Sequence, residues 1–76
     1  MTIEGTISAI METMPPDLVI EAVSGRWDVA IMEDTQVFLS GQPGSFGDFV
    51  PGQRVRISGE SAASGSLTAS RVEIKG

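Results

Sequence analysis

The chain has 76 residues, enough for one small hydrophobic core, so we expect a single domain over residues 1–76. Its net charge of −5 repels phosphate backbones and disfavours binding to nucleic acid. The sequence has no cysteine, no histidine and no apolar run long enough to cross a membrane, so it predicts no disulfide, no thiolate or imidazole chemistry and no membrane insertion. Localisation and oligomeric state stay open.

The first predicted strand covers residues 2–11. Aromatic residues make up only 5% of the chain, so the core must be aliphatic, and the β-branched share of such a core favours strands. Strict alternation places every odd-numbered residue from Ile3 to Met11 on the core face. Pro15 and Pro16 follow this strand and end it, because proline cannot donate to a strand ladder.

The second and third strands form a predicted hairpin around Ser24-Gly25. A two-residue turn at that dipeptide sets three apolar pairs on the core face: Ala22 with Trp27, Ile20 with Val29, and Leu18 with Ile31. In the same register Glu21 lies opposite Asp28 on the outer face. Since like charges opposite one another are unfavourable, we expect both to be solvated and screened, or to be neutralised by Arg71 or Lys75 from the last strand.

The fourth predicted strand covers residues 53–60 and the fifth residues 66–75, with a small-residue loop at 61–65 between them. Val55 and Ile57 face inward in the fourth strand. The fifth strand breaks parity between Ala69 and Val72, and a β-bulge near Ser70-Arg71 returns all its apolar residues to the core. With the strand-interior Gly5, this bulge allows a short sheet to curl closed.

These patterns predict an all-β fold: a small, five-stranded, OB-fold-like closed barrel whose first strand pairs with both the second and the fourth. Residues 34–52 form a long, largely non-helical connection between strands three and four, in which Val37 and Leu39 are at most a short extension. Trp27 is expected to plug one end of the barrel, and Phe46 and Phe49 to cap the other.

Three segments carry a family resemblance: Gly5-Thr6-Ile7-Ser8-Ala9-Ile10, the run from Phe49 to Gly59, and the run from Gly65 to Ile74. Together they resemble an uncharacterised family of small bacterial OB-fold-like modules. The resemblance covers nearly the whole chain and implies a fold rather than a chemistry. It also implies an accessory binding role, since members often occur in exported or envelope-attached proteins.

No cofactor or metal is expected. The chain is distantly similar to the periplasmic haem chaperone of cytochrome c maturation, but that family binds haem through a histidine, which this sequence lacks. The acidic groups at Glu33-Asp34 and Asp48 lack ligand-spaced positions, so we expect them to cap loops rather than hold a cation. Without histidine, cysteine or a Ser-Lys or paired-carboxylate spacing, the chain is not expected to be an enzyme.

The sequence favours a non-catalytic binding or structural module whose partner is a protein or an oligosaccharide. The alternative is a single-stranded nucleic-acid-binding domain, which the fold permits but which the net charge and the lack of stacking aromatics disfavour. A barrel without a ligand is a third possibility.

Any ligand is expected on the outer face of strands two and three and the adjoining loops, where OB-folds bind. The outward positions there include Asp28, Ala30 and Met32, none of them basic or aromatic. Such a surface suits a protein segment better than a polyanion. The candidate ligand-binding residues are Met14, Pro15, Val19, Val23, Arg26 and Ala63.

Overall fold

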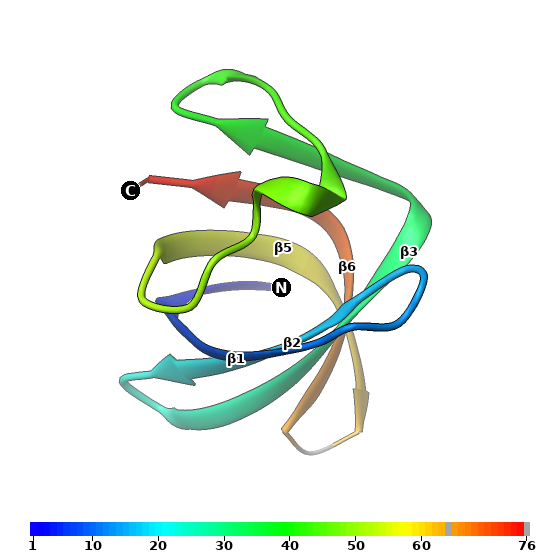
Figure 1. Cartoon of the computed structure of the whole chain (residues 1–76). Coiled ribbons are helices and arrows are strands. Elements are labelled where there is room, and N and C mark those ends of the chain that lie inside the picture. The colour runs from blue at the N-terminus through cyan, green and yellow to red at the C-terminus, as the bar shows by residue number, and fades with distance from the viewer. Residues whose placement is uncertain (64, 76) are drawn as a thin grey trace.

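The computed structural model describes residues 1–63 and 65–75, and they form an all-β molecule (Figure 1). The single 3-10 turn η1 (Phe46–Asp48) is the one helical element in that part of the chain. The strands are β1 (Thr2–Met11), β2 (Asp17–Ala22), β3 (Gly25–Leu39), β4 (Gln42–Pro43), β5 (Arg54–Ala63) and β6 (Ser66–Ile74).

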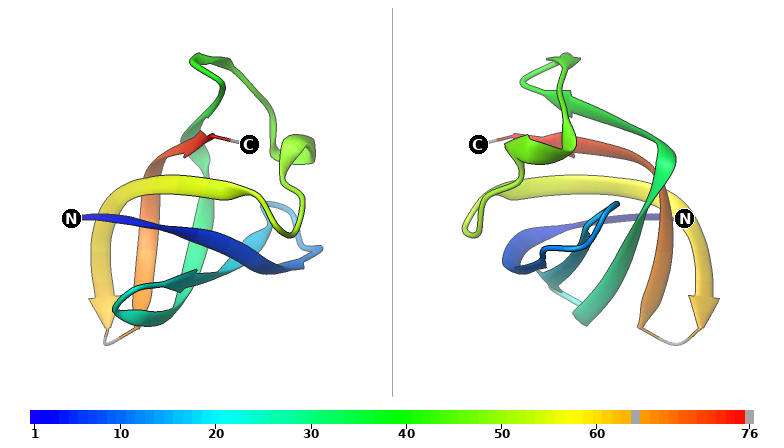
Figure 2. Two further views of the ribbon diagram at one scale, coloured as in Figure 1. Left: turned by 90° about the vertical axis from the view of Figure 1, so that its left-hand side faces the viewer. Right: turned by 45° about the vertical axis from the view of Figure 1, so that its right-hand side comes forward.

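Five of these strands close into a barrel. β1 pairs antiparallel with both β2 and β5, β2 pairs with β3, β5 pairs with β6, and β3 runs parallel to β6, which completes the ring (Figures 1 and 2). The two-residue β4 pairs only with the end of β3 and lies outside the ring. The predicted OB-fold-like barrel, with its first strand between the second and the fourth, is therefore confirmed.

The core is aliphatic, as the composition requires. Phe49 is its one buried aromatic residue among those described, while Trp27 and Phe46 are partly buried against the core. The other hydrophobic residues of the core come from every strand of the ring: Ile3, Ile7, Leu18, Ile20, Val29, Ile31, Val37, Val55, Ile57, Leu67, Ala69, Val72 and Ile74.

The expected alternation of β1 is wrong beyond Ile7. A β-bulge lies at Ser8, because Ile7 pairs with Ile20 whereas Ala9 pairs with the adjacent Val19. The extra residue reverses the faces, so Ile10 packs against the core and Met11 is 56% exposed.

The hairpin register is also different from the prediction. Ala22 pairs with Gly25 and Ile20 with Trp27, so the turn is Val23-Ser24 and the register moves by two residues. Gly25 is the first residue of β3 and lies just after the turn. Its φ of 125° is one that only glycine adopts readily. A two-residue shift keeps every side chain on its predicted face, but it changes which charges meet.

β3 does not end near Met32 but continues to Leu39, which the sequence reading missed. The pairing with β6 is interrupted between Ile31 and Gln36, and Thr35 bridges the gap. Its buried hydroxyl accepts a hydrogen bond from the Met32 amide at 2.8 Å and donates one to the Ala69 carbonyl at 2.7 Å. A side chain thus replaces the missing ladder bonds where the strand bends.

The bulge predicted near Ser70-Arg71 is confirmed. Ser58 pairs with Arg71 and Gly59 with Ala69, which leaves Ser70 as the extra residue on β6. A Cβ at Gly59 would collide with the Thr68 carbonyl, so the close approach of the two strands at this bulge requires glycine. β5 itself runs to Ala63, three residues further than predicted.

Candidate functional site

Arg26 is paired with Glu21, and the register that brings them together removes the predicted clash between Glu21 and Asp28. In the observed register Glu21 lies opposite Arg26, whose Nε is 3.3 Å from the Glu21 carboxylate, while Asp28 lies opposite Val19. The expectation that Arg71 or Lys75 neutralises these two acids is wrong. Arg71 instead pairs with its own strand neighbour.

Glu4 is the centre of a second charged group, on the outer face of β1 and β5. Its carboxylate lies 3.4 Å from the Lys75 Nζ and 3.5 Å from an Arg56 nitrogen. The hydrogen bond from Lys75, followed by the positive charge of Arg56, lowers the pKa of the Glu4 carboxyl below its usual value. Glu4 is therefore shared between two cations on this face.

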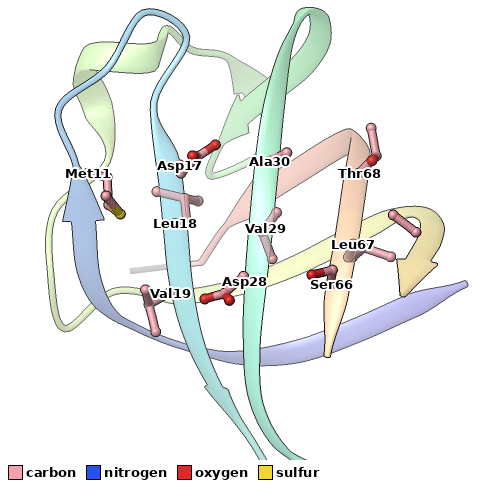
Figure 3. Close-up of a pocket in the computed structure, with 11 residues that line it drawn as sticks. Met11, Asp17, Leu18, Val19, Asp28, Val29, Ala30, Ser66, Leu67 and Thr68 are labelled. Carbon is pink, nitrogen blue, oxygen red and sulfur yellow. The ribbon is translucent and has the colours of Figure 1, made fainter. Parts of the chain in front are cut away.

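The outer face of β2 and β3 carries a groove of about 390 Å³ (Figure 3). The strand register explains how its floor is built, because outward residues of three strands line up in two rows. Asp17, Ala30 and Thr68 form one row, and Val19, Asp28 and Ser66 form the other. Met11 at the end of β1 and Ala62 at the end of β5 border the groove on opposite sides.

The groove combines apolar side chains with two hydroxyls and two carboxylates. Asp17 and Asp28 are diagonal neighbours on β2 and β3, and neither forms an ion pair with any residue described in the structure. Across residues 1–63 and 65–75, neither a basic nor an aromatic side chain lines the groove. The Asp28 amide donates a 2.8 Å hydrogen bond to the Gly65 carbonyl, which fixes the β5–β6 turn at the rim.

The six candidate residues from the sequence do not form one site. Val19 lies in the groove, and Ala63 lies beside its rim residue Ala62. Arg26 is further along the hairpin in its ion pair with Glu21, and Val23 is fully exposed at the hairpin tip.

The remaining two candidates, Met14 and Pro15, lie in the β1–β2 loop, outside the groove. Pro15 borders a hollow with Ile31, and Met14 borders another beside η1. Residue 64, in the predicted rim loop, lies outside the described residues.

Sequence reasoning left several groove residues out of the candidate set. Asp17, Asp28 and Ala30 point to the same outer face as Val19, and the alternation of apolar and polar residues is enough to predict this. Asp28 and Ala30 were recognised as outward positions. Met11 was placed on the core face because the bulge at Ser8 leaves no mark in the pattern. Ser66 and Thr68 come next to the hairpin only through the parallel pairing of β3 and β6.

A second, more apolar hollow lies between the β1–β2 loop and η1, and we call it the loop pocket. Its volume is about 580 Å³, and at its mouth Met14 is 92% and Val50 52% exposed. Its lining residues are Ile10, Glu12, Thr13, Met14, Pro16, Phe46, Gly47, Phe49, Val50 and Pro51.

Of the acidic residues expected to cap loops, Asp48 does so, whereas Glu33 and Asp34 lie within β3. The Asp48 carboxylate accepts a 2.8 Å hydrogen bond from the Ser45 amide at the start of η1. In the described part of the chain, no three acidic residues are grouped closely enough to hold a metal ion. Nor do those residues contain a helix long and apolar enough to cross a membrane.

Comparison with known sequences identifies the family but not a ligand. A search of the curated proteins gave no match. A family described as a domain of unknown function, DUF5666, matches residues 4–73, which run from the first strand of the barrel to the last. The resemblance carried by the strand motifs is thereby confirmed, and the chain belongs to the DUF5666 family of domains of unknown function.

Proposed function

We propose that this barrel is a non-catalytic binding module that holds an extended protein segment in the groove across β2 and β3. The observation that carries the proposal is the groove's composition: apolar side chains at Met11, Val19 and Ala30 beside two unpaired carboxylates. Apolar contacts supply affinity for such a segment, and the carboxylates select its charge and orientation.

Single-stranded nucleic acid is a poorer ligand for the same surface. OB domains that bind it combine a cationic groove with aromatic rings on which bases stack. Here the groove carries Asp17 and Asp28, and within the described residues its lining provides neither feature. The net charge of −5 adds long-range repulsion of the phosphates.

Catalysis is also disfavoured by the groove's own chemistry. Ser66 lies opposite Asp28 across β3 and β6, the one hydroxyl and carboxylate that face each other there. A serine nucleophile needs a base within hydrogen-bonding reach, and the structure gives no hydrogen bond between these two side chains in its described part.

The test is a selection of displayed random dodecapeptides on the immobilised protein, followed by affinity measurements with the selected peptides in solution. Ala30→Arg fills the groove and offsets one of its two negative charges, so we expect it to weaken binding at least about tenfold. Val23→Arg adds the same charge at the exposed hairpin tip and serves as the matched control.

Two outcomes would overturn the proposal. One is a selection that yields no peptide whose binding Ala30→Arg weakens more than Val23→Arg. The other is preferential binding of an oligothymidylate or of a cello- or chito-oligosaccharide to the same face, which would assign the groove to a different class of ligand.

A further inference from the structure

The loop pocket is more apolar than the groove, and the proposed function does not account for it. Single exposed apolar residues are ordinary, but here Met14, Val50 and the half-buried Phe46 converge on one opening. Ile10 and Phe49 form its base and belong to the margin of the core, so the pocket is continuous with well-packed structure.

Hydrogen bonds hold both walls of the loop pocket in place. On the η1 side, the Gln53 side chain accepts a 2.8 Å bond from the Val50 amide and donates a 3.0 Å bond to the Asp48 carbonyl. On the loop side, the Thr13 hydroxyl donates a 2.8 Å bond to the Pro15 carbonyl. A pocket with fixed walls loses little conformational freedom when a ligand enters, which favours binding.

The size of the loop pocket favours a single anchoring side chain over a second copy of the chain. A stable dimer interface buries about 1,200–2,000 Å² in total. A hollow of about 580 Å³ is of the scale that receives one or two bulky side chains.

The loop pocket and the groove are lined by consecutive residues at two places. Ile10 lines the pocket and the next residue, Met11, lines the groove; Pro16 lines the pocket and the next residue, Asp17, lines the groove. Because Ile10 and Met11 point to opposite faces of β1, a segment leaving the groove past Met11 and Asp17 reaches the loop pocket by crossing the end of that strand.

The charges around both hollows have one sign. Among the described residues, Glu12 is the one charged residue that lines the loop pocket. Asp17 and Asp28 are the charged residues that line the groove. A ligand that occupies both hollows meets three carboxylates and no cation, so it gains most if it is itself positively charged.

We propose that the protein segment held by the groove is cationic and bipartite: a bulky apolar side chain enters the loop pocket, while lysine or arginine residues face Asp17 and Asp28. This inference rests on the proposed function, whose partner it specifies. The exposed Met14 side chain then packs against the anchor, a contact to which an unbranched, polarizable side chain adapts well while the backbone of the wall stays in place.

The peptides selected on the wild-type protein test this composition directly. We expect enrichment of Lys or Arg together with Leu, Met, Phe or Trp. Replacing the apolar residue of the best peptide by alanine should weaken binding about tenfold, as expected for losing most of a buried side chain. Added salt should weaken binding further, because the carboxylates are exposed and therefore screened.

Variants of the protein separate the two hollows. Met14→Ser and Val50→Ser alter exposed side chains, so the fold should be preserved, and each should weaken binding of the anchored peptide several-fold. Val23→Ser makes an equivalent change at the hairpin tip and should have no effect.

The outcomes distinguish this inference from the proposed function. If peptides bind the groove and respond to Ala30→Arg, but acidic or wholly polar sequences are enriched or the loop pocket variants bind normally, the bipartite ligand is wrong and the groove proposal stands. If no selected peptide responds to Ala30→Arg, both are wrong.

Discussion

Replacing Thr35 by valine should destabilise the barrel, although the two side chains have nearly the same shape. Thr35 is the one buried polar side chain in the described structure, and its hydroxyl makes two short hydrogen bonds, to the Met32 amide and the Ala69 carbonyl. Valine leaves both backbone groups without a partner where β3 and β6 separate. An unsatisfied buried group costs about 1–3 kcal/mol, so we expect a loss of about 2–3 kcal/mol in the free energy of unfolding.

The assay is urea unfolding of the wild type, Thr35→Val and Thr35→Ser, with Thr6→Val as the control. Thr6 is only half-buried, and its hydroxyl has no hydrogen bond in the part of the chain described, so this change should be close to neutral. Serine keeps the hydroxyl and should retain most of the stability. A loss for Thr35→Val no larger than for Thr6→Val would refute the view that this hydroxyl holds the bend of β3 together.

Three further predictions concern the bulge, the Glu4 cluster and nucleic acid. Gly59→Ala should lower the urea midpoint far more than Gly47→Ala, because its Cβ meets the Thr68 carbonyl whereas the nearest atom to a Cβ at Gly47 is 3.8 Å away; equal midpoints would contradict the close approach at the bulge. Since Lys75 lowers the folded-state pKa of Glu4, the carboxylate stabilises the fold above its unfolded value of 4.5 and loses this effect as the pH falls through the lowered pKa. Glu4→Gln should therefore flatten the loss of stability in that acid range, and an unchanged pH profile would refute the pairing. Fluorescence anisotropy should detect no binding of labelled oligothymidylate at physiological salt; a salt-dependent micromolar complex would reverse the preference for a protein ligand.

A strand could be predicted correctly where its apolar residues show clearly whether they alternate or where the alternation is interrupted. In β6, Ala69 and Val72 cannot share a face without an inserted residue, so the bulge at Ser70 was readable from the sequence. In β1, residues on both sides of Ser8 are apolar, and either parity gives a plausible core face. The bulge that exposes Met11 was therefore invisible.

The hairpin register and the length of β3 were missed for different reasons. A shift of two residues leaves each side chain on the same face, so hydrophobic pattern cannot choose between turns at Val23-Ser24 and Ser24-Gly25. The polar residues Glu33 and Asp34 resemble a loop, but they lie on a strand whose continuity depends on the buried Thr35 hydroxyl. The Thr35 hydroxyl can replace the ladder hydrogen bonds only because β6 lies beside it, and the local sequence does not show that contact.

The only part of the candidate site that could be predicted is the part formed by the β2–β3 hairpin. Val19 could be assigned to the outer face of β2 from alternation alone, and the groove lies on that face. The loop pocket instead depends on the β1–β2 loop and η1 meeting across more than thirty residues of sequence. Met14 and Phe46 were each recognisable as apolar loop residues, but nothing local in the sequence brings them together.

The central claim is that the outer face of β2 and β3 binds a protein segment. The most direct measurement is a map of backbone amide shifts during titration of the isotopically labelled protein with a selected dodecapeptide. We expect the largest shifts at Val19, Asp28 and Ser66, which form one of the two rows of the groove floor. Shifts confined to the opposite side, around Glu4, Arg54 and Arg56, would contradict it.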